Sequence, residues 1–191
     1  MGVNVPSIKG SAFRSVSEDV KRLVDQGRID TEELASSLSD KDRGLLDAMI
    51  TPVAWVPVES YAHMLELLAR EEGGDDPICY LRDRGARAAE RLLSGTYQNF
   101  AAEPGTWGRR VGETMMGMGK LLYNFTEWSF HPETDDACEV HVSDAHDYPD
   151  AARYTAEGFL RWFAEHAAER PMRVESTRPS RDLVVLRIES A

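Results

Sequence analysis

The chain is poor in cysteine: it has only Cys79 and Cys138, which lie far apart and form no Cys-x-x-Cys pair. Two distant cysteines are typical of a reducing compartment, in which both stay thiols. The sequence also lacks an apolar run long enough to span a bilayer. Its first ten residues, MGVNVPSIKG, lack the basic and then apolar pattern of a secretion signal. We therefore expect a cytoplasmic protein without membrane insertion.

Clusters of basic residues are missing as well, and the formal net charge is −11. Binding to nucleic acid or to an anionic membrane surface requires clustered Lys and Arg, so neither partner is expected. The sequence contains no P-loop and no serine elbow, and the Gly112-x4-Gly117-x-Gly119 spacing has the wrong order for a phosphate loop. No constellation supplies an acid, a base or a nucleophile in a credible arrangement. We therefore expect a protein that is not an enzyme.

What the chain does contain favours one globular domain. Its 191 residues are 42% hydrophobic and 29% charged, enough for a single substantial core. We expect one domain over 1–191, with a helical part at about 11–130 and a sheet-containing module at about 137–190. Helical spacing and capping residues predict a helix over 11–26, short helices after Asp30 and Ser39, and helices starting at Pro57 and Pro77.

Prolines interrupt the segment Thr51–Pro57, which cannot be helical. We expect its Trp55 to fill the core between helices.

After residue 130 the pattern changes. Alternation predicts a half-buried strand over Cys138–Ser143, and the later segments predict a helix over Arg153–His166 and strands over 172–177 and 183–189. Helices followed by strand-helix-strand-strand predict an α+β fold with a small, mainly antiparallel sheet packed on helices.

The stretch Val111–Trp128, VGETMMGMGKLLYNFTEW, is predicted to be the central helix. Met115, Met118, Leu122 and Phe125 follow helical spacing and either belong to the ordinary core or line a pocket or a dimer groove. Gly117 and Gly119 each cost a helix up to about 1 kcal/mol relative to Ala. A close helix contact, a kink or a bound ligand would explain these glycines.

Short motifs at both ends of the chain resemble a known superfamily. They are Ile8-Lys9-Gly10-Ser11 at the start and, near the end, Tyr154, Gly158-Phe159-Leu160, Phe163-Ala164-Glu165-His166 and Val174-Glu175. The superfamily contains the haem-dependent nitric-oxide and oxygen sensors, the vinyl-reductase-type ligand-binding domains and the TRAPP tethering subunits. The Lys-Gly-Ser opening also resembles a paralogous family from myxobacteria, a likeness that implies no activity.

The resemblance implies haem for the sensor members, but this sequence departs from their pattern twice. Leu121 stands about where their iron-binding histidine would be expected, and no histidine lies between His63 and His131. The sensors also hold the haem propionates with a Tyr-x-Ser-x-Arg motif, whose spacing is missing from residues 147–153. We therefore predict that haem is absent.

The resemblance leads to two hypotheses for function. The first is a sensory module that binds a small apolar ligand without catalysis. Its pocket is predicted to contain Met115, Met118, Leu121, Leu122, Phe125, Phe159 and Trp162. The second is a protein-interaction or scaffold module similar to the TRAPP subunits, acting as a homodimer or with a signalling partner.

A metal site is a weaker candidate. Cys138, His141 and His146 form a Cys-x2-His-x4-His pattern among acidic residues. However, Cys138 and His141 are three apart on a predicted strand and should face opposite sides of the sheet. We therefore predict a solvated surface loop and no metal.

Overall fold

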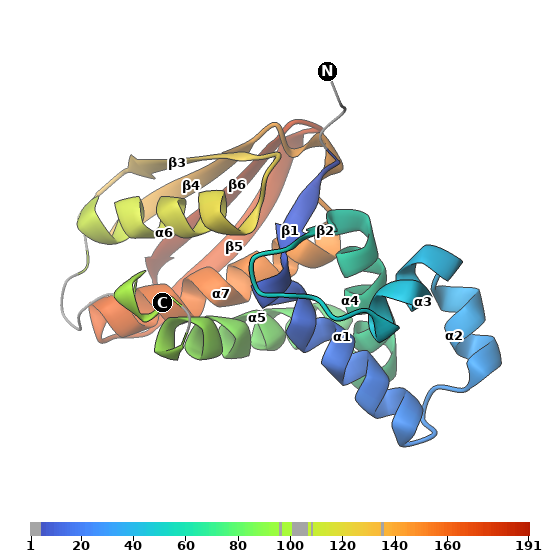
Figure 1. Ribbon diagram of the computed structural model, residues 1–191. Coiled ribbons are helices and arrows are strands. Elements are labelled where there is room, and N and C mark those ends of the chain that lie inside the picture. Colours follow the sequence, from blue (N-terminus) through green and yellow to red (C-terminus); the bar gives the residue numbers. More distant parts are fainter. Residues whose placement is uncertain (1–4, 96, 101–106, 108, 135) are drawn as a thin grey trace.

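The computed structural model describes residues 5–95, 97–100, 107, 109–134 and 136–191. Helices precede a C-terminal antiparallel sheet, which confirms the α+β prediction (Figure 1). The helices of the described part are α1 (Gly10–Asp25), α2 (Thr31–Ser37), α3 (Asp40–Asp47), α4 (Val58–Glu72), α5 (Pro77–Ser94), α6 (Arg109–Leu122) and α7 (Asp150–Ala168). Two short 3-10 turns, η1 (Gln98–Phe100) and η2 (Ala145–Asp147), connect longer elements.

The large sheet has the strand order β3-β4-β6-β5, and every neighbouring pair is antiparallel. Its strands are β3 (Glu127–Pro132), β4 (Ala137–Ser143), β5 (Met172–Ser180) and β6 (Leu183–Ser190). Buried and more exposed residues alternate along β4 and β6, as expected for a sheet with one covered face. Helices α6 and α7 supply the cover, packing mainly on β3 and β5 respectively (Figure 1).

The predicted extent of the central helix was wrong. Helix α6 ends at Leu122, and the last two residues of the predicted helix, Glu127 and Trp128, belong to strand β3. The sheet therefore gains a strand before Cys138. Trp128 and Phe130 are two apart on that strand and both turn toward α6, so their spacing reflects the strand period.

A small N-terminal ribbon joins the two halves of the chain. Strand β1 (Ser7–Lys9) pairs with β2 (Trp55–Pro57), and Ile8 also bridges to Tyr123 just after α6. Trp55 does not fill the core, so that prediction was wrong. Its neighbour Val56 points inward and is 2% exposed, which forces Trp55 to the opposite side, where it is 44% exposed. The Lys9 ammonium lies 3.6 Å from the centroid of the Trp55 ring.

Capping residues begin several helices as predicted. The Asp30 side chain accepts a hydrogen bond from the Glu33 amide at the start of α2, and Asp76 accepts one from the Cys79 amide at the start of α5. Ser39 and Asp42 form a complete capping box at the start of α3. Asp42 is 2% exposed and lies 2.9 Å from His63 Nδ1, so this cap also ties α3 to α4.

Helices α5 and α7 cross in direct backbone contact. A β-carbon on Gly158 would lie 1.7 Å from the Arg82 carbonyl oxygen, and one on Gly85 would lie 1.9 Å from the Thr155 carbonyl oxygen. Both positions therefore require glycine. Helix α7 therefore packs on the face of α5 that contains Gly85.

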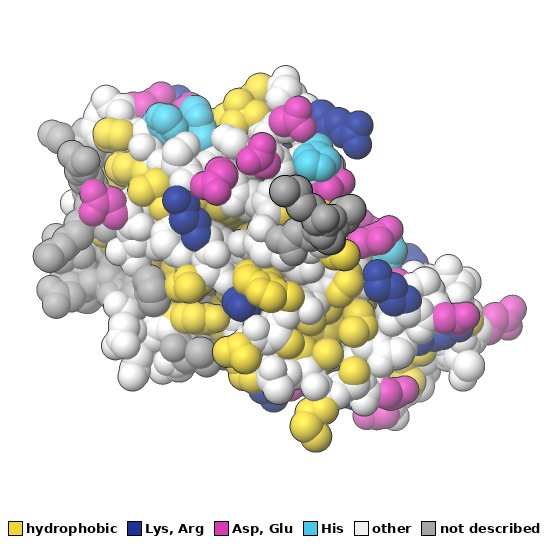
Figure 2. All heavy atoms as spheres, turned by 45° about the horizontal axis from the view of Figure 1, so that its top comes forward, with side chains coloured by type: hydrophobic (Ala, Val, Ile, Leu, Met, Phe, Trp, Pro, Cys, Tyr) yellow, Lys and Arg dark blue, Asp and Glu magenta, His cyan; other side chains and the backbone are white. Residues whose placement is uncertain are grey.

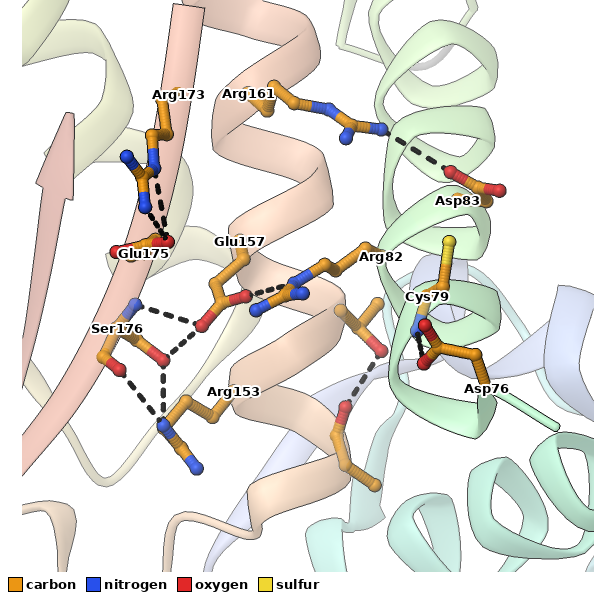
Figure 3. A network of polar contacts seen from close by, with 12 residues as sticks. Asp76, Cys79, Arg82, Asp83, Arg153, Glu157, Arg161, Arg173, Glu175 and Ser176 are labelled. Carbon is orange, nitrogen blue, oxygen red and sulfur yellow. Dashed lines mark hydrogen bonds and ion pairs between the residues drawn. The ribbon is translucent and has the colours of Figure 1, made fainter. Parts of the chain in front are cut away.

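A buried carboxylate holds this helix pair against the sheet (Figure 3). Glu157 of α7 is 1% exposed and accepts hydrogen bonds from Arg82 Nε at 2.5 Å and from the Ser176 amide at 2.9 Å. The Ser176 hydroxyl also donates to Glu157, and Arg153 donates to that hydroxyl at 2.8 Å. One carboxylate thereby connects α5, α7 and β5, which fixes the position of α7.

The surface of the molecule carries both charged and hydrophobic side chains. On the face in Figure 2, hydrophobic side chains gather near the middle of the view, whereas acidic, basic and histidine side chains are scattered around them. Within the described ranges, no helix combines the length and the apolar character that crossing a membrane requires.

Candidate functional site

An apolar cavity of about 50 Å³ lies where the N-terminal helices meet α6, α7 and β3. Its wall combines aliphatic, thioether and aromatic side chains with few polar groups. The lining residues are Ile8, Ala12, Tyr61, Ala88, Leu92, Met115, Met118, Gly119, Leu122, Tyr123, Trp128, Thr155, Ala156, Phe159 and Leu160. No Asp, Glu, Lys, Arg or His is among them.

The wall formed by α6 and β3 depends on a glycine. Gly119 leaves room for the indole ring of Trp128, because a β-carbon there would lie 2.3 Å from Trp128 Cδ2. The Trp128 Nε1 donates to Thr126 Oγ1 at 3.0 Å, so the buried indole nitrogen is satisfied. Tyr123 stacks on the indole with ring centroids 6.0 Å apart.

Three tyrosines make the polar part of this region. Tyr61 and Tyr123 line the cavity, and the ring of Tyr148 lies 5.2 Å from that of Tyr123. Burial raises the pKa of Tyr61 to about 12 and raises the pKa of Tyr123 well above its usual range. The nearby Tyr148 and Tyr61 hydroxyls raise the Tyr123 pKa further. All of them are therefore neutral hydroxyls at physiological pH, able to donate a hydrogen bond.

Tyr148 has an unusual environment. Its side chain is 2% exposed, and its hydroxyl has no hydrogen-bond partner of normal geometry among the described residues. Burial also raises the pKa of Tyr148, an effect that the neighbouring Tyr123 hydroxyl opposes. A buried hydroxyl without a partner normally costs free energy.

The cavity brings together part of the predicted pocket. Met115, Met118, Leu122 and Phe159 line it. Leu121 and Phe125 are partly buried and pack on the core outside the cavity wall. Trp162 also lies outside the wall and stacks on the exposed His166 ring.

The aromatic and hydroxyl side of the cavity was not predicted from the sequence. Tyr123 and Trp128 belong to the stretch 111–128, but a single helix over that stretch would have put both on a helical face. Tyr61 and Thr155 lie on other helices, and no spacing rule links them to residues 115–122. Alternation of Trp128 with Phe130 was the one signal that pointed to a strand.

The weak metal candidates do not converge. Cys138 is 2% exposed on the covered face of the sheet, and burial raises its pKa to about 12. His141 faces the other side, where its Nε2 lies 2.8 Å from Glu139 Oε2, and His146 pairs with Asp147 at 2.9 Å. Among the described residues, no three His, Cys, Asp or Glu side chains are placed to hold a metal ion.

The cavity residues do not fit haem. The lining offers neither a histidine nor a cysteine as an iron ligand, and neither arginine nor lysine for the propionates. The Tyr61 and Tyr123 hydroxyls are held in the neutral form by burial, which disfavours them as phenolate ligands. A porphyrin is also far larger than the space between these side chains.

No protein-family model matches the sequence, and no curated protein matches it either. Solved structures do match in fold. A mutant of the T. tengcongensis H-NOX has a TM-score of 0.60 at 16% identity, covering 96% of this chain and 97% of that one. The Fe(II) unliganded mutant H-NOX protein from K. algicida has a TM-score of 0.64 at 10% identity, covering 96% and 97%.

A third similar structure is an oxygen-binding H-NOX domain related to soluble guanylate cyclases, in its oxygen complex. Its TM-score is 0.55 at 13% identity, covering 95% of this chain and 92% of that one. The chain therefore has the fold of H-NOX domains over almost its full length. The resemblance to the haem-sensor superfamily holds at the level of the fold.

Proposed function

We propose that this chain is a sensory, non-enzymatic module that binds a small apolar ligand in the cavity between α6, α7 and β3, and that it does not hold haem. The observation that carries the proposal is the composition of that cavity wall, which is apolar apart from tyrosine and threonine hydroxyls. Further support comes from the H-NOX fold, because the similar proteins include one described as oxygen-binding.

Filling the cavity would stabilise the protein. An unfilled apolar cavity costs about 24 cal/mol for each Å³ of its volume, or on the order of 1 kcal/mol for this one. A ligand without charge regains this energy without desolvating a charged group. The wall supplies no cation or anion to compensate a charged ligand.

The position of the cavity suits a sensor. Ile8 and Ala12 come from the N-terminal part of the chain, whereas Met115 and Met118 come from α6. Ile8 is also bridged to Tyr123. A ligand that changes the spacing across the cavity would therefore act on the contact between the N-terminal ribbon and α6.

Native mass spectrometry of the purified chain, together with a hemin titration followed by absorbance, tests both halves of the proposal. We expect a small apolar molecule or a thermal shift with apolar probes, and no saturable Soret band. A stoichiometric Soret band would contradict the haem-free assignment. Failure of every apolar probe to bind would contradict the ligand assignment.

A pair of variants on α5 provides the matched control. Ala88 lines the cavity, whereas Ala86 is two residues away on the same helix and does not. We expect Ala88→Leu to fill the cavity and abolish probe binding, and Ala86→Leu to leave binding unchanged. Equal binding in both variants would place the ligand elsewhere.

A second candidate function is the protein-interaction module, and one observation favours it. Residues 48–58 form a run without acidic or basic side chains. In that run Met49 is 96% exposed and Val53 is 75% exposed. A contiguous exposed apolar patch marks a contact surface, and this uncharged segment is the candidate for such a patch. Sedimentation would test a homodimer through this segment: the paired change Met49→Ser and Val53→Ser should convert it to a monomer, and a wild-type monomer at micromolar concentration would exclude it.

A further inference from the structure

Three tyrosine side chains lie in or beside the cavity wall, and among the described residues one of their hydroxyls, that of Tyr148, has no hydrogen-bond partner of normal geometry. Tyr148 Oη is buried without a hydrogen-bond partner of normal geometry, although Tyr123 and Tyr61 are close enough to affect its ionisation. Tyr148 itself does not line the cavity, whereas Tyr123 and Tyr61 do. Tyr148 is thus the neighbour of a residue of the cavity wall, with its ring centroid 5.2 Å from that of Tyr123.

Buried hydroxyls that lie close together can form hydrogen bonds to one another in a chain. Each O–H can donate to the next oxygen, which leaves the last proton of the chain without an acceptor. If Tyr148 donates to Tyr123, the Tyr123 proton is the one left over. The nearby hydroxyl of Thr155 already donates to the Ala151 carbonyl at 2.8 Å, and Trp128 Nε1 already donates to Thr126. Among the described residues, the tyrosines are therefore the hydroxyl donors of the wall for which no fixed acceptor is seen.

We propose that the ligand carries a carbonyl oxygen on a small apolar body, and that Tyr123 donates a hydrogen bond to this oxygen with Tyr148 positioned behind it. This inference rests on the proposed function of the cavity. A neutral acceptor completes the chain of hydroxyls, and the remainder of the ligand contacts Met115, Met118 and Leu122. A carboxylate would lose its hydration without meeting a cation, because no Lys or Arg lines the cavity.

The volume limits the size of this ligand. About 50 Å³ is smaller than the roughly 150 Å³ of an engineered core cavity that binds benzene. We therefore expect short-chain ketones or aldehydes to bind better than aromatic carbonyl compounds. Flexible Met115 and Met118 side chains allow the wall to adapt around a branched carbon chain.

Three probes of similar size form the test, with dissociation constants measured from the methyl resonances of Met115 and Met118 in the full chain. 2-Butanone has the carbonyl, 2-methyl-1-butene replaces its oxygen with a methylene group, and butanoate has a charged carboxylate. We expect 2-butanone to bind roughly fivefold more tightly than the alkene, the gain from one net hydrogen bond. Butanoate should bind at least about tenfold more weakly than 2-butanone.

Two hydroxyl deletions distinguish the roles of the tyrosines. Tyr123→Phe should make 2-butanone and the alkene bind equally, whereas Tyr80→Phe, whose hydroxyl pairs with Glu72 away from the cavity, should keep the difference. Tyr148→Phe should reduce the difference without lowering the melting temperature, because it removes a buried hydroxyl that has no partner.

The outcomes separate this inference from the proposed function. If both neutral probes bind equally to the wild type, or if the difference survives Tyr123→Phe, the carbonyl assignment is wrong while the apolar cavity stands. Butanoate binding as tightly as 2-butanone would overturn it in the same way, and so would a large loss of stability in Tyr148→Phe. If no probe binds, the proposed function fails and the inference fails with it.

Discussion

Gly119 of α6 faces the indole ring of Trp128 so closely that a β-carbon at residue 119 would lie 2.3 Å from Trp128 Cδ2. Gly112 lies seven residues earlier in α6, about two turns away on the same face, and it faces Phe130 in the same way, again at 2.3 Å. Two aromatic rings of β3 are thus seated on two glycines of α6. This packing explains why a helix that forms part of the core contains glycine at these positions.

Gly119→Ala should destabilise the protein although alanine favours the helix. The new methyl group displaces the indole, at an overpacking cost of about 1–3 kcal/mol, which exceeds the gain of up to about 1 kcal/mol in helix propensity. Urea unfolding measures the difference. Gly44→Ala in α3 is the control, because a β-carbon there meets open space and should leave stability unchanged or increased.

The crossing of α5 and α7 should tolerate substitution even less. At Gly158 the obstacle is the backbone carbonyl of Arg82 at 1.7 Å, which cannot rotate away as a side chain can. We expect Gly158→Ala to lower the free energy of unfolding by more than Gly119→Ala does, or to prevent folding. Circular dichroism melting compares the two variants. If Gly158→Ala loses less stability than Gly119→Ala, the two helices can separate at little cost in free energy.

Removing the charge of Glu157 should destabilise the protein strongly. Glu157→Gln keeps one acceptor oxygen but replaces the other with an NH2 donor and removes the charge, so Arg82 and Ser176 can no longer both be satisfied. Breaking a buried ion pair in this way costs about 3–5 kcal/mol. The exposed pair Arg161–Asp83 links the same two helices (Figure 3), with side chains 37% and 54% exposed. Asp83→Asn should cost less than about 1 kcal/mol. Similar losses in the two variants would contradict the structural role of Glu157.

Because of Asp42, the free energy of unfolding should depend on pH in the acidic range. Burial alone would raise the pKa of Asp42, but hydrogen bonds from Ser60, Ser39 and His63 outweigh it and lower the pKa below its ordinary value. Because the folded pKa is the lower one, the carboxylate stabilises the fold above the unfolded pKa of about 4 and loses this effect as pH falls through the folded pKa.

The stability difference between wild type and Asp42→Asn should therefore be constant from neutral pH to about pH 5 and should shrink below about pH 4. Chemical unfolding at a series of pH values measures it. The exposed Asp40, paired only with Arg43 in its own helix among the contacts described, provides the control variant Asp40→Asn. A difference that grows on acidification would mean that the Asp42 pKa is raised on folding.

Local signals in the sequence were enough to predict most of the fold. Asp30, Ser39 and Asp76 marked helix starts correctly because capping depends on residues only three apart. The strand β4 was also predicted from its own alternation. In contrast, residues 123–130 contain aromatics that suit either a helix or a strand, and only packing against Gly112 and Gly119 decides between them.

The candidate site was predicted less completely for the same reason. Met115 and Met118 were found because they follow helical spacing within one element. Tyr61 and Thr155 reach the cavity from α4 and α7, and no local pattern connects them to α6. The position of Trp55 on the surface also follows from the pairing of β1 with β2, which is a tertiary contact.

The most direct test of the apolar cavity is the methyl spectrum of ¹³C-labelled methionines under xenon, which enters apolar cavities. The chain supplies its own controls, because Met49 is 96% exposed and Met172 is buried outside the cavity wall. We predict saturable shifts of the Met115 and Met118 methyl resonances, with Met49 and Met172 unchanged. Unchanged Met115 and Met118 resonances, or equal shifts at Met49 and Met172, would contradict the central claim that this H-NOX fold encloses an apolar ligand site.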